Sequence, residues 1–335
     1  MPRVDSQYHE RQEHMRAVQH AYPGCEVQEF EEQGHCSYTL LVSFKALASV
    51  YRAKNLHMDR HSEGATRPAV IVQIRSMQHT INLDIAQTAK LTYSHLAPSI
   101  KSLELQLPAL SFAYEMEKMR GTPLSRLLPR SSELDEETQR KQQMFIVSFA
   151  AFIAQGWQTS PELHPGSGKF RADSPMQIAP EMLSQCMGRV GSSIIRRLEK
   201  LAAELPDEEL RQHAKDVLSY VTTMDDFPVM LTHGDLIPSN ILVDESTWEI
   251  TGIVDWAEAE YLPFGTCLLR EHFWHCLLDA RPQIGKKQED VLTMRDMGVL
   301  LWYGYAWDDG AIHRVVNETD DANEVACLRA FLHPK

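Results

Sequence analysis

The sequence lacks several features that would assign a protein to a special class. Its apolar runs all fall short of the roughly 20 residues that a membrane-spanning helix needs, and residues 1–10 contain no apolar core of the kind that a signal peptide has. The six cysteines form no Cys-x-x-Cys pair and no zinc-binding spacing. Internal repeats and low-complexity tracts are also missing. These absences predict a cytoplasmic protein with reduced thiols and no membrane partner.

Positive charge is scarce as well. The chain has 33 Lys and Arg residues against 46 Asp and Glu residues, which gives a net charge of −13. Such acidity argues against a nucleic-acid partner, because the phosphate backbone would be repelled. It is compatible with a cationic or neutral ligand. With 335 residues, of which 43% are hydrophobic, the chain is typical of a globular protein large enough for two lobes.

One nucleotide-binding signature is incomplete. Residues 166–169 read Gly-Ser-Gly-Lys, as at the end of a phosphate-binding P-loop. A P-loop also needs a glycine at position 163 and a serine or threonine at position 170, where this chain has Leu163 and Phe170. The stretch therefore predicts an irregular loop and no phosphate site.

A different pattern carries the chemistry. Residues 231–240 contain His-Gly-Asp followed by four residues and Asn240, so that Asp235 and Asn240 share one short loop. The apolar residues 241–243 predict a strand, and a turn and a return strand at 248–254 would bring Asp255 back beside Asn240. His-Gly-Asp alone is common in loops, but the complete pattern is much rarer. It suits phosphoryl transfer, which needs one acid at the attacking hydroxyl and further oxygen ligands for a metal.

The complete pattern resembles the catalytic-loop motif of the aminoglycoside phosphotransferase and choline kinase superfamily. The resemblance implies an α+β, two-lobed protein-kinase-like fold. A small antiparallel-sheet lobe at 1–118 would bind the nucleotide, and a larger, mainly helical lobe at 119–335 would hold the catalytic and substrate residues. The expected reaction transfers the γ-phosphate of ATP, with Mg²⁺, to a hydroxyl group of a small molecule.

The motif also assigns individual roles by resemblance. Asp235 takes or orients the proton of the acceptor hydroxyl, and His233 braces the loop by hydrogen bonding and is not the base. Asn240 and Asp255 hold Mg²⁺ on the phosphates.

The first lobe departs from the family. Relatives carry a lysine on the strand that matches residues 68–75, but here Gln73 takes that position and Arg75 lies on the same face. Arg75 is expected to supply the missing cation, the alternative being a solvated charge at the strand end. Asp84, on the following helix, is the predicted acid that orients it.

Two further segments are expected to meet the nucleotide. Gly34 and Ser37 lie in the turn that covers the phosphates in relatives, although an ordinary β-turn is an equal alternative. Backbone groups near Met116 and Met119 match the inter-lobe strand and would contact adenine, unless both methionines belong only to the core.

The acceptor side is less defined. Glu258 and Glu260 follow the Asp-Trp pair and are expected to reach the metal shell or a cationic substrate, although at least one of them is expected to be a solvated surface acid. Trp302 is a candidate for stacking on an amine or a ring, with an aromatic core between helices as the alternative. An antibiotic, a choline-like amine, a sugar, an amino acid and a secondary metabolite all remain open as acceptors.

Two other functions fit the same motif. The missing strand lysine favours a catalytically impaired, pseudokinase-like protein that binds nucleotide or acts as a scaffold. Alternatively, phosphorylation activates a hydroxyl for loss, which gives dehydration or cyclisation in a biosynthetic pathway and releases free phosphate.

Overall fold

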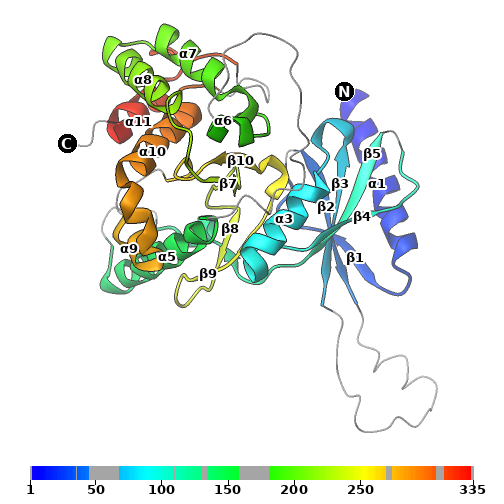
Figure 1. Ribbon diagram of the computed structural model, residues 1–335. Coiled ribbons are helices and arrows are strands. Elements are labelled where there is room, and N and C mark those ends of the chain that lie inside the picture. The colour runs from blue at the N-terminus through cyan, green and yellow to red at the C-terminus, as the bar shows by residue number, and fades with distance from the viewer. Residues whose placement is uncertain are drawn as a thin grey trace. The chain divides into compact units, whose positions relative to one another are not determined.

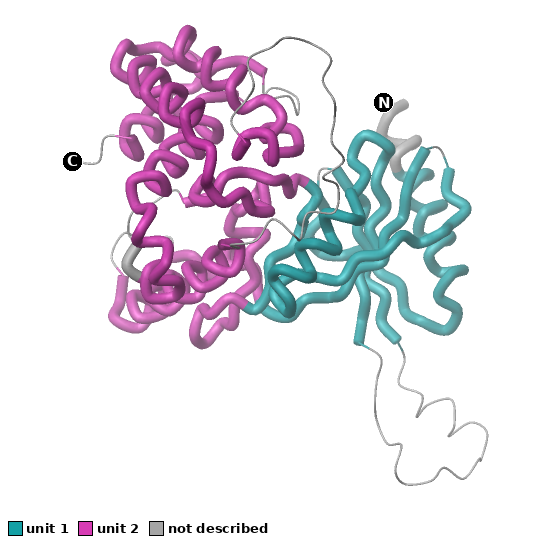
Figure 2. Tube along the Cα trace, in the orientation of Figure 1, with its two compact units in different colours: residues 1–121, 251–257 teal, residues 122–250, 258–335 magenta. Residues whose placement is uncertain are grey.

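The chain folds into two compact units. The computed structural model describes residues 2–34, 36–44, 68–108, 110–129, 134–157, 181–268, 274–306 and 313–332. Unit 1 comprises residues 1–121 and 251–257, and unit 2 comprises residues 122–250 and 258–335 (Figure 2). The Gly-Ser-Gly-Lys stretch at 166–169 lies outside the described residues. The expected roles of the two lobes in nucleotide and substrate binding stay predictions.

Unit 1 is built on a five-stranded antiparallel sheet with the strand order β1-β2-β3-β5-β4 (Figure 1). Its strands are β1 (Glu26–Glu29), β2 (Ser37–Ser43), β3 (Val70–Ser76), β4 (Ile100–Leu103) and β5 (Ser111–Glu117). Apolar residues alternate along β3, where Val70, Val72 and Ile74 all belong to one core cluster. The alternation places Gln73 and Arg75 together on the opposite face, as the sequence predicted.

Helices cover both faces of this sheet. Helix α1 (Pro2–Ala21) contributes Val18 to the cluster that contains Ala113 of β5. Helix α3 (Leu83–Tyr93) packs Ala86 with the next residue of β5, Tyr114, in a second cluster. Because neighbouring residues of a strand point to opposite faces, the two helices lie on opposite sides of the sheet. Short 3₁₀ turns η1 (Met77–His79) and η2 (Ser94–Leu96) flank α3.

Unit 2 is mainly helical. Its helices are α4 (Leu124–Leu127), α5 (Glu136–Gln155), α6 (Glu181–Gln185), α7 (Ile194–Glu204), α8 (Glu208–Val221), α9 (Trp274–Ala280), α10 (Gln288–Tyr303) and α11 (Ala322–Leu332), with 3₁₀ turns η4 (Gly191–Ser193) and η7 (Pro282–Lys287). Two short strand pairs join them: β6 (Thr122–Pro123) with β8 (Ile241–Val243), and β7 (Val229–Thr232) with β10 (Glu260–Pro263). The predicted α+β fold, with an antiparallel-sheet part and a larger helical part, is confirmed.

The chain passes between the units in two further elements. These are β9 (Ile250–Ile253) and the 3₁₀ turn η5 (Trp256–Glu258). Within the described residues, no helix is long and apolar enough to cross a membrane.

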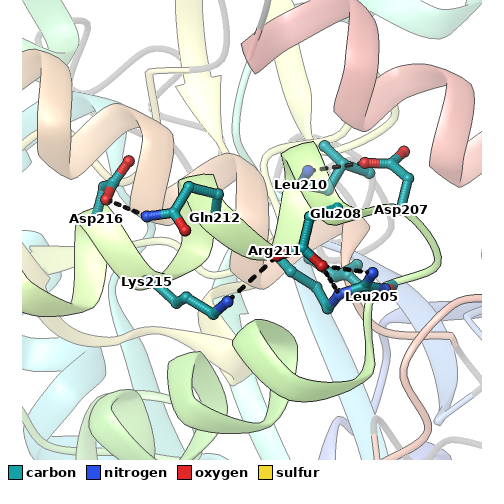
Figure 3. A network of polar contacts seen from close by, with 8 residues as sticks. All are labelled: Leu205, Asp207, Glu208, Leu210, Arg211, Gln212, Lys215 and Asp216. Carbon is teal, nitrogen blue, oxygen red and sulfur yellow. Dashed lines mark hydrogen bonds and ion pairs between the residues drawn. The ribbon is translucent and has the colours of Figure 1, made fainter.

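A polar network fixes the junction of α7 and α8 (Figure 3). Asp207 caps α8, because its Oδ1 accepts the Leu210 N–H at 2.8 Å. Its Oδ2 accepts from Arg329 of α11, also at 2.8 Å. Arg211 reaches back to the Leu205 carbonyl and pairs with Glu208. Asp207 therefore joins the start of α8 to the last helix of the chain.

Replacing this cap will destabilise unit 2. We expect Asp207→Ala to lower the free energy of unfolding by about 1–2 kcal/mol at pH 7, measured by urea denaturation. Asp216→Ala is the matched control, since Asp216 lies exposed on the same helix and accepts a hydrogen bond from Gln212. Equal losses in the two variants would contradict the capping role.

The stabilisation that Asp207 provides is expected to depend on pH. Burial raises the pKa of Asp207, but the Leu210 N–H and Arg329 outweigh it, so the pKa is lowered on folding. A lowered carboxyl pKa stabilises the fold above its unfolded value of about 3.9. The difference between wild type and Asp207→Ala will therefore shrink as the pH falls below about 4. A difference that is constant from pH 7 to pH 3 would be the opposite result.

Candidate active site

In the loop after β7, the side-chain amide of Asn240 binds Asp235 at two points. The Asn240 Nδ2 group donates to the Asp235 backbone carbonyl at 2.9 Å and to its carboxylate Oδ2 at 3.0 Å. The Ile237 N–H donates to the same carbonyl at 3.0 Å, and the Asn240 N–H donates to the Ile237 carbonyl at 2.9 Å. The loop is thus closed on itself, and the position of the Asp235 carboxylate is fixed by Asn240. The amide oxygen of Asn240 is left as an acceptor.

His233 lies inside the same loop. It is only 2% exposed, and its Nδ1 accepts the Asp235 N–H at 3.3 Å. An accepting Nδ1 places the ring proton of the neutral imidazole on Nε2. The predicted bracing role of His233 requires a hydrogen bond of this kind to the Asp235 backbone.

Gly234 permits the loop to approach η5 closely. Its φ is +77°, a left-handed conformation that favours glycine. A Cβ atom there would lie 2.0 Å from the Glu258 carbonyl oxygen. Any other residue would therefore move Asp235 or the start of β10. Glu258 itself is exposed, and its Oε2 lies 3.7 Å from Arg189 Nη1.

In unit 1, Arg75 and Asp255 form an ion pair. Arg75 Nη2 donates to Asp255 Oδ1 at 2.8 Å, and Arg75 Nε donates to Gln73 Oε1 at 3.0 Å. The arginine is 4% exposed, whereas the Asp255 side chain is 43% exposed. Asp255 also has a φ of +63°, which is unusual for a residue with a side chain.

The residues around Asp255 support this conformation. The Trp256 indole donates to the Ile253 carbonyl at 2.9 Å. Its ring packs against Tyr93 of α3, with 5.1 Å between the centroids. Strained backbone that its surroundings hold in place is common at functional sites.

The structure contradicts the alternative given for Arg75 and the predicted pairing of Arg75 with Asp84. Arg75 is not a solvated charge at the strand end, because it is only 4% exposed in the central strand of the sheet. Its acid partner is not Asp84, which is exposed in the first turn of α3. Asp255, 180 residues away in the chain, takes that place. Asp84 was predicted to act on the nucleotide by orienting Arg75, and the contacts of Arg75 do not support that role.

The turn between β1 and β2 carries Gly34 and Ser37 and is fixed by Gln33, which sequence reasoning missed. The Gln33 amide donates to the Phe30 and Thr39 carbonyls and accepts the Thr39 N–H, at 2.8–2.9 Å. These hydrogen bonds join the two sides of the turn. A glutamine next to a turn glycine was the only signal in the sequence.

The two methionines of the inter-lobe segment pack within unit 1. Met116 is half-buried against the cluster that contains Tyr114. Met119 lies against Gly252, where an added Cβ would be 3.0 Å from its methyl group. Their side chains are thus part of the packing, and the contact of their backbone with adenine stays a prediction.

Glu258 and Glu260 differ in environment. Glu258 is exposed, as expected of at least one of them. Glu260 is 6% exposed, and its Oε2 accepts the Val190 and Gly191 N–H groups at 2.8 Å each. Burial raises the pKa of Glu260, although these two hydrogen bonds oppose the rise. Glu260 is thus a buried anchor for the turn before η4, a role that the sequence analysis missed.

Trp302 is half-buried on α10. The next residue, Tyr303, stacks on Phe331 of α11 with 5.4 Å between the rings. This stacking is the helix-to-helix aromatic packing named as the alternative, and the stacking of Trp302 on an acceptor stays a prediction.

The two expected metal ligands are chemically suited to Mg²⁺. Asn240 offers an amide oxygen, and Asp255 offers the carboxylate oxygen that Arg75 does not bind. Hard oxygen ligands in small number, completed by water and substrate phosphate, are what Mg²⁺ prefers. In the described part of the chain, no group of three or more His, Cys, Asp or Glu residues forms a metal cluster. Asn240 belongs to unit 2 and Asp255 to unit 1, so their approach stays a prediction.

Comparison with known proteins identifies the family. The sequence pattern of the phosphotransferase enzyme family, APH, matches residues 87–266, more than half of the chain. The chain belongs to this family. The matched range contains the closed loop of Asp235 and Asn240 as well as Asp255. No curated protein matches the chain.

Several solved structures of phosphotransferases are similar to the chain at low identity. A macrolide 2'-phosphotransferase from Brachybacterium faecium is 16% identical, with 96% of this chain and 98% of that chain covered and a TM-score of 0.49. An aminoglycoside-3'-phosphotransferase of type VIII is 17% identical over 87% and 99% of the two chains, with a TM-score of 0.43. A choline kinase from Streptococcus pneumoniae is 12% identical over 95% and 100%, with a TM-score of 0.42.

The close approach at Gly234 can be tested by adding one methyl group. Gly24 has a similar φ of +81° but nothing within 4 Å of an added Cβ, so it is a matched control. We expect Gly24→Ala to show only the left-handed strain of about 1–2 kcal/mol. Gly234→Ala will lose more stability in urea denaturation, because a clash is added to the same strain. Equal losses would show that the carbonyl of Glu258 yields easily.

Proposed function

We propose that the chain transfers the γ-phosphoryl group of ATP, in a magnesium-dependent reaction, to a hydroxyl group of a small molecule in the cytoplasm. The observation that carries the proposal is the Asn240 amide, which fixes both the backbone and the carboxylate of Asp235. Membership of the phosphotransferase enzyme family supports the same reaction type. An acid held in this way is suited to positioning an attacking hydroxyl.

Asp235 acts on the acceptor. Its carboxylate accepts a hydrogen bond from the acceptor hydroxyl and keeps the oxygen in line with the phosphorus. Placement matters more than basicity, because the transition state is loose and the proton leaves late. His233 holds the Asp235 backbone, because its Nδ1 accepts the Asp235 N–H. It takes no proton from the acceptor.

Asn240 and Asp255 hold magnesium through their side-chain oxygens. When bound, the metal neutralises charge on the phosphates. Arg75 supplies the cation that a lysine supplies in relatives, and Gly34 and Ser37 cover the phosphates. Adenine lies on the backbone near Met116 and Met119.

A pseudokinase-like protein is the second candidate, favoured by Gln73 in place of the strand lysine. Nucleotide-dependent thermal shift with and without Mg²⁺, followed by ATP turnover on an acceptor panel, separates the two. Binding without turnover on any acceptor favours the pseudokinase. Turnover that releases free phosphate along with a dehydrated or cyclised product, seen by mass spectrometry, favours the dehydration reaction.

Asp235→Asn tests the role of the acid. The amide keeps the size of the side chain but loses the charge that orients the acceptor hydroxyl and takes up its proton, so we expect turnover to fall about 10²- to 10⁴-fold. Nucleotide affinity, measured by calorimetry, will stay within about twofold, because the metal ligands are intact. Asp216→Asn, on the exposed face of α8, is the charge-matched control. Turnover near wild type in Asp235→Asn would remove Asp235 from the mechanism.

Arg75→Ala tests the replacement of the lysine. Loss of a charged hydrogen bond to phosphate is expected to weaken nucleotide binding or transition-state stabilisation by about 1.5–3 kcal/mol. Lys101→Ala is the control, since Lys101 is an exposed cation of the same unit. An unchanged Kd and kcat in Arg75→Ala would show that another group neutralises the phosphates.

A further inference from the structure

The ion pair of Arg75 and Asp255 joins two groups that the proposed function assigns to different partners. Arg75 is assigned to the phosphates and Asp255 to the metal. In the structure, the 2.8 Å contact satisfies each with the other. Among the described residues, the remaining polar partner of Arg75 is Gln73, which is neutral.

The burial of Arg75 makes this pairing strong. A guanidinium that is 4% exposed cannot rely on water, so a counter-ion is needed to offset its desolvation. Asp255 is more exposed and would be solvated if it were released. The pair is therefore asymmetric, since Arg75 depends on Asp255 more than Asp255 depends on Arg75.

Each ligand by itself disrupts the balance of charge. Mg²⁺ alone would bind the Asp255 oxygen that Arg75 leaves open and would withdraw negative charge from the buried guanidinium. A nucleotide alone would draw Arg75 away and leave Asp255 facing anionic phosphates. When both ligands bind, Arg75 meets phosphate and Asp255 meets the metal, so no charge is left unpaired.

We propose that the Arg75–Asp255 ion pair is a lock on the empty site, which nucleotide and Mg²⁺ open together and neither opens alone. This inference rests on the proposed function. The lock makes the two ligands bind cooperatively, and by linkage each favours the other to the same extent. Gln73 binds the Arg75 Nε group, which leaves Nη2 to exchange partners, and the Trp256 indole anchors the backbone next to Asp255.

The first test measures stability without any ligand. We expect Asp255→Asn to lower the midpoint of urea unfolding more than Arg75→Gln does, because only the first leaves a buried guanidinium unpaired. The double variant will be no less stable than Asp255→Asn, so the two effects are not additive. If Asp255→Asn does not fold, recovery of a folded double variant supports the lock. Additive losses, or a double variant that also fails to fold, would overturn it.

The second test measures ADP affinity by calorimetry with magnesium removed by a chelator. Asp255→Asn frees Arg75 for phosphate, so we expect about tenfold tighter ADP binding than in wild type. In an Arg75→Gln background, the same change is expected to alter the affinity by less than about twofold, because no locked cation remains. Glu137→Gln, which removes a carboxylate from an exposed pair in α5, controls for net charge.

The outcomes separate the lock from the reaction. If Asp255→Asn tightens ADP binding equally with and without Arg75, the cause is general repulsion between Asp255 and the phosphates, and the lock is overturned. In that case, ADP binding in the presence of Mg²⁺ still supports the proposed function. A chain that binds no nucleotide under any condition overturns both. Tightening that depends on Arg75, together with non-additive stability, supports the lock.

Discussion

A buried guanidinium needs a carboxylate, and this requirement organises unit 1. Arg75 lies within the central strand of the sheet, and its counter-ion comes from residues 251–257, far along the chain. That short segment belongs to unit 1 although its neighbours on both sides belong to unit 2. The left-handed backbone of Asp255 and the packing of Trp256 on Tyr93 are the local means by which the carboxylate reaches Arg75.

In unit 2, the candidate catalytic acid Asp235 is held in a different way. The contacts that position Asp235 include an amide and an imidazole close by in the sequence. Asn240 binds the carboxylate, His233 binds the backbone, and Gly234 lets the loop meet the Glu258 carbonyl without a clash. These hydrogen bonds fix the position of the carboxylate. The proposed role of Asp235, which orients an acceptor hydroxyl, requires such a fixed position.

Local pattern was a good guide wherever the decisive contacts are close in sequence. The shared face of Gln73 and Arg75 follows from the period of a strand. The closed loop of Asp235 and Asn240 spans only five residues. Asp84 was a wrong choice because helix spacing suggests near neighbours, while the acid that pairs with Arg75 lies 180 residues away. The anchor role of Glu260 was missed for the same reason, since its partners at 190 and 191 are distant in the chain.

The sequence by itself determined the family, the α+β class and the identity of the loop that carries Asp235 and Asn240. It could do so because a catalytic loop and alternating strands are short-range patterns. The tertiary structure alone decided that Arg75 is buried and that Asp255 is its partner. Burial and ion pairing depend on which distant segments pack together, and the spacing of residues along the sequence does not show this.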